Sequence, residues 1–361
     1  MKFYHLCLVF LLFTATLFYL SATTPITPHE AEVFFTSSSW VSKAMHLGKS
    51  TFGDFFGLRA VFVLFGVLSA LMFFAVSQKY FTKSEDVYLA TVVFMFLPGT
   101  LVGATLANES MVLLFGVLLF IWLHFKGWKI AQFLVLFSLL FVHHSAIIIY
   151  VALAIYALFF KNRFLLISSI LFIGLCFFFG SFIPVGGKPS GHFLENFGAL
   201  AAVFSPFLFL FFAYSMYRIL VKGEKDIIWY ISFFSFVVSL MLSIRQKVNI
   251  IDFAPYMIIA LLPMVKLFYR SFRCRLPQYR FKHKIGFYAV LIVMMLSSAT
   301  IVFHKSLFIF FDDSSRHFAY KVYAPYWKAK ELKVKNIDCY ESKSIKERYQ
   351  MRYYGISQCD I

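Results

Sequence analysis

Charged residues are scarce in this sequence of 361 residues. Asp, Glu, Lys and Arg supply 14% of it, against about a quarter in an average soluble domain. There are only 17 glycines and five cysteines, which excludes a collagen-like chain and a small scaffold held by many disulfides. Hydrophobic residues make up 61% and aromatic residues 21%, so a disordered chain is excluded as well. Too little polar surface remains to cover a folded body in water, and the sequence predicts an integral membrane protein.

Long apolar runs separated by charged residues predict an all-α, polytopic membrane protein with about eleven transmembrane helices. The runs are continuous, as from Leu113 to Leu123, and lack the alternation of apolar and polar residues that marks a membrane β-strand. The predicted spans are 6–22, 58–78, 87–107, 110–125, 130–142, 145–160, 164–184, 199–221, 227–244, 249–268 and 285–304.

Lysine and arginine are distributed unequally between the connections of these spans. Alternate connections are rich in them, most of all the segment 266–284, and the intervening ones hold few. Basic loops stay on the cytoplasmic side, so we expect a cytoplasmic (inner) membrane protein with its N-terminus inside and its C-terminus outside. This asymmetry accounts for the net charge of +17, and we expect no nucleic-acid partner. We prefer an uncleaved first helix to a signal peptide, because Leu20 is bulky where a cleavage site needs a small residue.

The last part of the chain differs in composition, since Lys, Arg, Tyr and acids replace the Phe and Leu runs. We divide the sequence into a transmembrane domain, 1–304, and a small exported C-terminal cap, 305–361. Cys339 and Cys359 both fall in this cap. A disulfide between them is possible in an oxidising compartment and would stabilise the cap by about 3 kcal/mol; the alternative is two free thiols.

The first outer loop contains a recognisable helix start. Thr27 is a typical N-cap, Pro28 suits the first helical position, and Glu30 is placed to complete a capping box. The mixed polar and apolar residues that follow predict a helix lying in the membrane interface. Glu30 therefore has two interpretations, a helix cap or a catalytic carboxylate. His29 and Glu32 are three residues apart and share a helix face.

A second group lies at the outer end of the third span. Pro98 and Gly99 loosen that span, and Asn108 and Glu109 follow it. An acid at the start of a helix is favoured by the helix dipole, which is one interpretation of Glu109. The other is a carboxylate at the membrane surface that faces the first outer loop.

The remaining outer connections supply further polar residues. His143 and His144 are adjacent at a tight connection. Adjacent residues of a helix point about 100° apart and no third metal ligand is nearby in sequence, so we predict substrate or interfacial contacts for these histidines and no metal. Arg245 and Lys247, between the predicted spans 227–244 and 249–268, suit a lipid phosphate, or they snorkel at a helix end. The candidate substrate-binding residues are Glu32, Arg59, Asn108, His143, His144, Lys188, Arg245, Lys247 and Asp252.

These motifs resemble those of the multi-spanning GT-C glycosyltransferases, in particular the branch that contains protein O-mannosyltransferases and lipid A aminoarabinose transferases. The resemblance covers roughly residues 1–160 and rests on the first-loop acids, on the Leu97-Pro98-Gly99 segment and on the acid after the third span. His29-Glu30 falls where the family commonly has Asp-Glu. Asn108-Glu109 falls where the family has an acid.

The resemblance implies a GT-C-like fold and transfer of a sugar from a polyprenyl-phosphate-linked donor to a glycan, lipid or protein acceptor at the outer face. The family's first-loop aspartate is the proposed base, and His29 stands in its place here. We therefore predict that His29, Glu30 and Glu109 are catalytic and that Arg59, Arg245 and Lys247 hold the phosphate. No organic cofactor is implied, and metal dependence is left open.

Three other functions use the same features. An oligosaccharide polymerase or ligase of surface-polysaccharide assembly would need the same lipid carrier and outer bases. A flippase of a lipid-linked glycan is less favoured, because the sequence has no internal repeat and its polar residues gather at one membrane face. A noncatalytic partner in glycan assembly is suggested by the missing first-loop aspartate.

Overall fold

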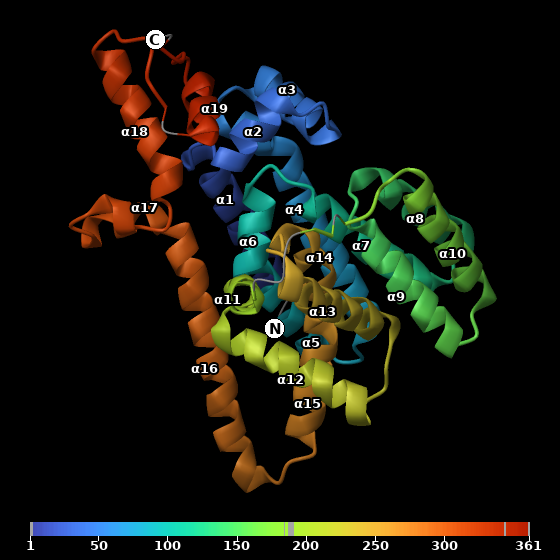
Figure 1. The fold of residues 1–361 in the computed structure, drawn as a ribbon. Helices are drawn as coiled ribbons and strands as arrows, with labels where there is room; N and C mark the ends of the chain where they lie inside the picture. The colour runs from blue at the N-terminus through green and yellow to red at the C-terminus, as the bar shows by residue number, and fades with distance from the viewer. Residues whose placement is uncertain (1–2, 184, 187–190, 343, 360–361) are drawn as a thin grey trace. The chain divides into compact units, whose positions relative to one another are not determined.

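The structure, a computed structural model, describes residues 3–183, 185–186, 191–342 and 344–359. These residues form helices joined by short connections (Figure 1), with one isolated β-bridge between Cys339 and Ser357 and no strand in the described ranges. The prediction of an all-α protein is confirmed. The repeated apolar runs favour helices, because a helix satisfies its backbone hydrogen bonds internally where no water is available.

The helices of the first half are α1 (Phe3–Thr23), α2 (Pro28–Thr36), α3 (Trp40–Phe52), α4 (Asp54–Tyr80), α5 (Ser84–Met95), α6 (Pro98–Thr105), α7 (Ser110–Lys126), α8 (Lys129–Val142), α9 (Ala146–Phe159) and α10 (Arg163–Phe178). Those of the second half are α11 (Phe193–Phe204), α12 (Pro206–Lys222), α13 (Ile227–Arg245), α14 (Ala254–Ile258), α15 (Leu261–Arg273), α16 (Pro277–Val302), α17 (His304–Leu307), α18 (Tyr320–Val334) and α19 (Ile345–Tyr353). Short 3-10 turns are η1 (Ile250–Asp252), η2 (Phe308–Phe310) and η3 (Ser314–Arg316).

The apolar helices make this a multi-pass membrane protein. In the described residues, α1, α4, α13 and α16 are each long and apolar enough to cross a bilayer, and two bent helix pairs bring the number to six if each pair is one span. The shorter apolar helices are α7, α8, α9 and α10. Each predicted span coincides with one of these helices or with a group of consecutive helices, while the total of eleven crossings stays a prediction.

Two predicted spans are broken into helix pairs. The span 87–107 is α5 and α6, which meet at 54° beside Pro98, and the span 199–221 is α11 and α12, which meet at 104° beside Pro206. A proline lacks an N–H and disfavours helical backbone in the residue before it, so each proline begins a new helix. Ser205 has φ 75° and turns the chain sharply at the second break.

Two further expectations about helices are corrected by the structure. The predicted span 249–268 is interrupted, since η1 and the single turn of α14 precede α15. The single interfacial helix expected in the first outer loop is two helices, α2 and α3. Helix α2 ends at Thr36, and Ser39 is the N-cap of α3, where its hydroxyl accepts a hydrogen bond from the Ser42 N–H.

Packing divides the described chain into two compact units. The first unit comprises 1–13, 65–103 and 109–298, and the second comprises 14–64, 104–108 and 299–361. The second unit therefore combines the predicted cap, 305–361, with the first outer loop, which lies far away in sequence. The boundary proposed from the sequence at residues 304 and 305 stays a prediction.

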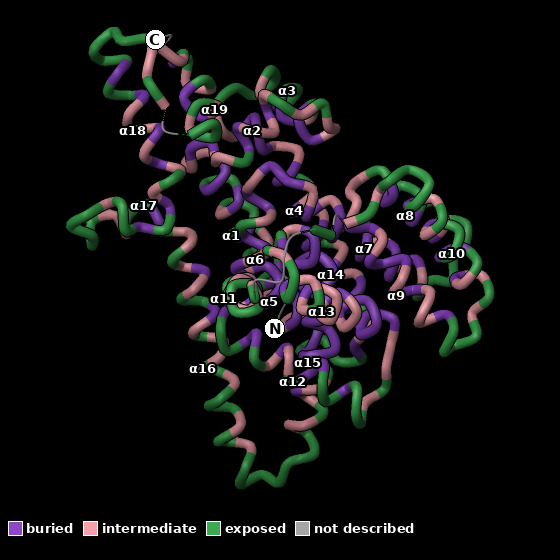
Figure 2. The backbone as a smooth tube through the Cα atoms, in the orientation of Figure 1, coloured by how far each residue is buried: buried purple, intermediate pink, exposed green. Residues whose placement is uncertain are grey.

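The first unit is built on α7, α9, α13 and α14. Helix α9 packs against α10 and α13, α7 packs against α8 and α14, and α5 packs against α15. Figure 2 shows α7, α13 and α14 largely buried, whereas α16 is exposed over most of its length. Apolar side chains of α16, such as Ile285 and Leu296, are exposed, which is the expected surface of a helix that faces lipid.

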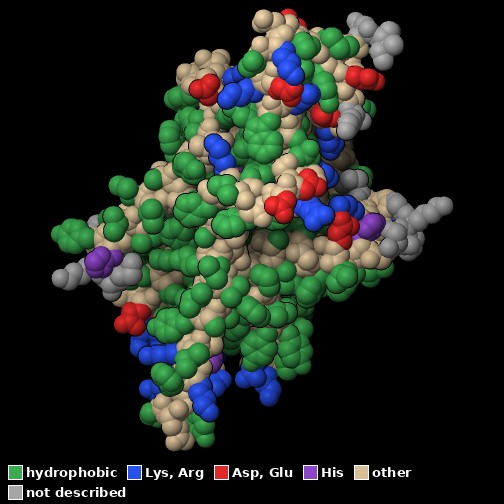
Figure 3. All heavy atoms as spheres, turned by 90° about the vertical axis from the view of Figure 1, so that its left-hand side faces the viewer, with side chains coloured by type: hydrophobic (Ala, Val, Ile, Leu, Met, Phe, Trp, Pro, Cys, Tyr) green, Lys and Arg blue, Asp and Glu red, His purple; other side chains and the backbone are tan. Residues whose placement is uncertain are grey.

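Basic residues gather at one end of the first unit. A cavity of about 630 Å³ is lined by Arg218 and Lys222 of α12, by Arg270 of α15 and by Arg275. Figure 3 shows lysine and arginine side chains clustered at the lower end of the face that it draws. Arg270 and Arg275 fall in the segment 266–284, which the sequence assigns to the cytoplasmic side. Their grouping agrees with that assignment, and the orientation of the termini stays a prediction.

The second unit joins the first outer loop to the end of the chain. Helix α19 packs on α2 (Figure 1), and Tyr349, Tyr353 and Tyr354 cover a buried cluster that includes Phe34 and Met45. The tail has its own small core around α18 and α19. Cys339 and Cys359 form a disulfide in the structure, with their Cα atoms 4.9 Å apart. The disulfide therefore closes a loop within the tail, and the tyrosine packing holds the tail against α2 and α3.

Helices α3 and α4 approach closely at two glycines. A Cβ atom on Gly48 would lie 2.1 Å from the carbonyl oxygen of Gly57, and one on Gly57 would lie 2.7 Å from that of Gly48. Real Cβ contacts are not this short, so only glycine permits the backbones to cross here.

We expect Gly48→Ala to lower the free energy of unfolding by about 1–3 kcal/mol, because α3 must move away from α4. The measurement is thermal unfolding of the detergent-solubilised protein. Gly174→Ala is the matched control, since a Cβ atom on Gly174 in α10 meets nothing within 4 Å and should leave stability unchanged or slightly raised. Equal melting temperatures for Gly48→Ala and the control would contradict the close crossing.

Candidate functional site

The first turn of α2 has the capping box that its sequence predicts. The Glu30 N–H donates to the Thr27 hydroxyl (3.2 Å), and the Thr27 N–H donates to the Glu30 carboxylate (2.9 Å). Pro28 occupies the first turn of the helix. These bonds fix the position of Glu30, and they use one lone pair of its Oε2 atom.

Arg59 of α4 forms an ion pair with Glu30 through two contacts. The Arg59 Nε donates to Glu30 Oε1 (2.8 Å) and Nη2 donates to Oε2 (2.6 Å). The relative exposures of the two side chains are 0% and 1%, so the pair is shielded from water. This paired geometry is the strongest arrangement of arginine with a carboxylate.

All remaining donors of Arg59 are also used. Its Nη1 donates to the carbonyls of Ser21 (3.1 Å) and Thr24 (2.6 Å), and its Nη2 donates to that of Pro25 (3.0 Å). The five N–H groups of a guanidinium are thus all engaged, and none is left over for a ligand phosphate. Arg59 therefore joins the end of α1 to α2 and α4.

The Glu30 carboxylate has one further donor, the N–H of Ala107 (2.8 Å). Burial alone raises the pKa of Glu30, but the charge of Arg59 and the hydrogen bonds from Arg59, Ala107 and Thr27 outweigh it, and the pKa lies below its ordinary value. Glu30 is therefore an ionised and fully bonded carboxylate. Such a group suits a positioning role better than proton transfer.

The other sequence-predicted residues of this region have different surroundings. His29 is exposed, and Glu32 pairs with Lys346 of α19 (3.1 Å). Asn108 is buried, with its side-chain amide donating to the Leu106 carbonyl (3.2 Å). Glu109 is half-buried at the N-cap position of α7.

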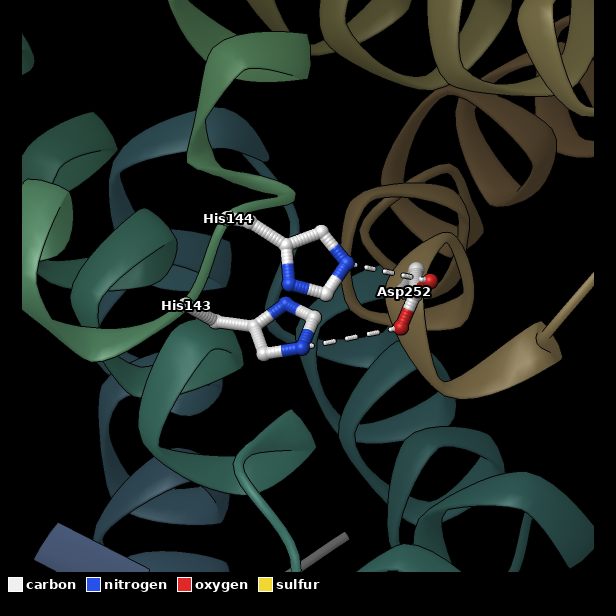
Figure 4. Close-up of side chains that lie close together, drawn as sticks. All are labelled: His143, His144 and Asp252. Atoms are coloured by element: carbon white, nitrogen blue, oxygen red, sulfur yellow. Dashed lines mark ion pairs between the residues drawn. The ribbon is translucent and has the colours of Figure 1, made fainter. Parts of the chain in front are cut away.

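The paired histidines meet Asp252 in the first unit (Figure 4). His143 Nε2 lies 3.8 Å from Asp252 Oδ1, and His144 Nε2 lies 3.6 Å from Asp252 Oδ2. The expectation that adjacent histidines diverge is corrected, because they do not lie in a helix. His143 has extended backbone (φ −160°, ψ 149°) where α8 ends, and the two ring centroids are only 3.8 Å apart.

Ser145 and Tyr256 support this cluster and were not identified from the sequence. The Ser145 hydroxyl lies 3.0 Å from His143 Nδ1 and 3.3 Å from the Tyr256 hydroxyl. Burial and the neighbouring His144 lower the pKa of His143 to about 4, against an opposing attraction to Asp252. His143 is therefore a neutral imidazole near pH 7.

The predicted outer bases are exposed. Lys247 makes a short ion pair with Glu195, whose other oxygen lies 3.2 Å from His192 Nδ1. Arg245 ends α13, and its side chain is exposed. Exposed ion pairs contribute little stability, so Lys247 can exchange Glu195 for another anion at small cost. Lys188 lies outside the described residues.

A cavity of about 860 Å³ lies in the second unit, beside the start of α2. Its wall includes Pro28, the aromatic residues Tyr320 and Trp327 of α18, and Tyr340. Polar side chains also line it, among them Gln350. Nothing in the sequence alone indicated this cavity, because its walls come from both ends of the chain.

The fold of this chain is similar to that of a known membrane protein. No family model matches the sequence, and no curated protein matches it. Among solved structures, the chain is similar to ArnT from Cupriavidus metallidurans bound to undecaprenyl phosphate, with a TM-score of 0.58 and 12% identity over 96% of this chain and 74% of that one. The chain has an ArnT-like fold. The apo structure of ArnT gives a TM-score of 0.54 and 14% identity over the same shares of the two chains.

The ArnT-like fold extends the similarity beyond the residues from which a GT-C resemblance was inferred. The sequence motifs covered roughly residues 1–160, whereas the structural similarity covers 96% of the chain. At 12–14% identity the similarity is one of fold and assigns no role to an individual residue.

We expect Arg59→Met to lower the free energy of unfolding by about 3–5 kcal/mol, because Glu30 would remain buried without its counter-charge. The double variant Glu30→Gln/Arg59→Met removes both charges and should recover part of this loss. Thermal unfolding in detergent measures both. A double variant that is no more stable than Arg59→Met would show that the packing of the arginine, rather than its charge, stabilises the fold.

The same pair predicts a dependence of stability on pH. The pKa of Glu30 in the folded protein lies below its ordinary value near 4.5, so the pair stabilises fully above that value and loses its effect as pH falls through the lowered pKa. The melting temperature of the wild type should therefore fall more steeply below about pH 4.5 than that of Glu30→Gln. Parallel curves for the two proteins would contradict the ionised state of Glu30.

Proposed function

We propose that this protein is a membrane glycosyltransferase that takes a sugar from a polyprenyl-phosphate-linked donor and transfers it to a lipid-linked or surface glycan or a protein. The observation that carries the proposal is the ArnT-like fold over 96% of the chain, since one of the two similar ArnT structures holds undecaprenyl phosphate. A lipid-linked donor carries its own leaving group. The protein then needs to orient an acceptor, exclude water and receive a proton.

The surroundings of the first-loop residues support a division of roles. His29 is exposed and follows Pro28, which lines the cavity of the second unit. We assign His29 as the base that removes the proton of the acceptor hydroxyl while its oxygen bonds to the sugar C1 and the polyprenyl phosphate leaves. Glu30 and Arg59 are assigned as positioning residues, because their hydrogen bonds hold the turn that carries His29.

The cavity beside α2 is suited to an acceptor glycan. Sugar rings present apolar faces and hydroxyl edges, and this cavity offers the aromatic rings of Tyr320, Trp327 and Tyr340 together with polar groups such as Gln350. The exported cap would then contribute directly to recognition of the acceptor.

The roles of the remaining predicted residues stay proposals for the same reaction. Glu109 would help to position the acceptor, and Arg245 and Lys247 would hold the donor phosphate. The exposure of both bases leaves them accessible to a lipid headgroup.

We expect His29→Ala to reduce transfer by at least about 100-fold, which is the usual contribution of a general base. The assay follows radiolabelled sugar from a panel of undecaprenyl-phosphate hexoses to an acceptor lipid in proteoliposomes of the full-length protein. Glu109→Gln should also reduce transfer. The matched controls are His5→Ala and Glu85→Gln, which replace exposed residues outside the proposed machinery.

Two outcomes would contradict this assignment. Wild-type transfer that persists in His29→Ala would remove the histidine from its role as base. Movement of the labelled lipid across the vesicle without transfer would favour the flippase, and extension of the acceptor by whole oligosaccharides would favour the polymerase or ligase.

A further inference from the structure

The side chains of His143, His144 and Asp252 converge on one point in the first unit (Figure 4). The histidines lie in the turn between α8 and α9, and Asp252 lies in η1, far along the chain. One potential ligand atom from each residue lies within 4.8 Å of the other two. In a tetrahedral zinc site with bonds of about 2.0–2.2 Å, neighbouring ligand atoms are about 3.3–3.6 Å apart. His144 Nε2 lies 3.6 Å from Asp252 Oδ2, which is close to this spacing, and His143 Nε2 lies 3.8 Å from the other oxygen, Oδ1. A set with one oxygen ligand forms when the carboxylate turns one of these oxygens toward both rings.

We propose that His143, His144 and Asp252 bind a Zn²⁺ ion, with one coordination position left for water or for an anionic oxygen. Two imidazoles and one carboxylate form a donor set that zinc commonly uses when three protein ligands leave the fourth position open. The two nitrogen ligands disfavour Mg²⁺ and Ca²⁺, which prefer oxygen.

The surroundings of His143 are able to orient a zinc ligand. The Ser145 N–H donates to His143 Nδ1 (3.2 Å), which places the ring proton on Nε2, facing Asp252. With zinc at Nε2, the ring proton would be on Nδ1 and would be donated to the Ser145 hydroxyl oxygen (3.0 Å), and the Ser145 N–H would give up its bond to Nδ1. The Tyr256 hydroxyl lies 3.3 Å from that oxygen and continues the hydrogen-bonded chain. Partners of this kind hold the imidazole in the orientation that a metal requires.

The carboxylate is held in place as well. The side-chain amide of Asn249 donates to Asp252 Oδ1 (3.3 Å), and the Asp252 side chain is only 8% exposed. The exposures of the His143 and His144 side chains are 13% and 34%, so the open side of the cluster is at His144. An ion can therefore reach the cluster past His144.

Another histidine–carboxylate contact provides an internal comparison. His192 Nδ1 lies 3.2 Å from Glu195, but the second neighbour of Glu195 is the Lys247 ammonium, which repels a cation. Among the described residues, three potential metal ligands come together at His143. At His192 the described residues supply only two, His192 and Glu195. His192→Gln is therefore a suitable control variant.

The test uses full-length protein without a histidine tag, stripped with a chelator and titrated with ZnCl₂ by calorimetry. We expect one Zn²⁺ per chain in the wild type and an affinity at least about 100-fold weaker in His144→Gln and in Asp252→Asn. Ser145→Ala keeps all three ligands and should weaken binding by about 10–100-fold. His192→Gln should bind as the wild type does. Co²⁺ in place of Zn²⁺ should give the intense visible absorption of a tetrahedral site.

The absence of one-to-one binding in the wild type would overturn the proposal, and so would equal affinity in the wild type, His144→Gln and Asp252→Asn. If the two ligand variants do not fold, Ser145→Ala provides the test. An unchanged zinc affinity in Ser145→Ala, together with an octahedral Co²⁺ spectrum of the wild type, would exclude the site. These measurements need neither donor nor acceptor. The zinc proposal therefore stands or fails independently of the transferase activity.

Discussion

The second unit depends on the hydrogen bonds and the counter-charge that the buried guanidinium of Arg59 receives. Arg59 is fully buried near the start of α4, and no charged residue follows it in that helix before Lys79. A charge in such surroundings is stable only if it is paired and its donors are all used. Three of its donors bind carbonyls at the end of α1, and two bind Glu30. The turn between α1 and α2 therefore has one conformation. His29 follows in the first turn of α2, so the position of the predicted base depends on Arg59, a residue to which no proton transfer is assigned.

The same carboxylate also connects a distant part of the chain. By accepting the Ala107 N–H, Glu30 joins the segment that follows α6 to the start of α2. The capping box and the ion pair are consequently parts of one hydrogen-bonded network. A helix cap and a functional carboxylate were separate interpretations of the sequence, and the structure shows the cap together with a role that neither interpretation included, which is the partner of Arg59. The signal was present, because an arginine within an apolar span requires a nearby acid.

The cluster at His143 shows how a local rule fails when its assumption fails. The divergence of adjacent histidines holds inside a helix, but α8 ends at Val142 and His143 is extended. The two ring centroids then lie 3.8 Å apart with the ring planes tilted by 40°, and Asp252 approaches both rings. Proximity in sequence indicated only two of the three potential ligands, because the third is supplied by the packing of α14 against α7 and α13 in the same unit.

The sequence by itself determined the all-helical, membrane-embedded character of this protein, the positions of most apolar helices, the start of α2 and the resemblance to GT-C transferases. These properties follow from composition, from runs of apolar residues and from local capping, which act over a few residues. Only the tertiary structure decided that Glu30 is locked to Arg59, that α11 and α12 meet at a steep angle, that the tail packs on the first outer loop and that Asp252 joins two histidines. The sequence indicates that Arg59 needs an acid and that a new helix begins at Pro206, but it gives neither the partner nor the angle. The other two contacts join residues far apart in the chain, for which one sequence contains no local signal.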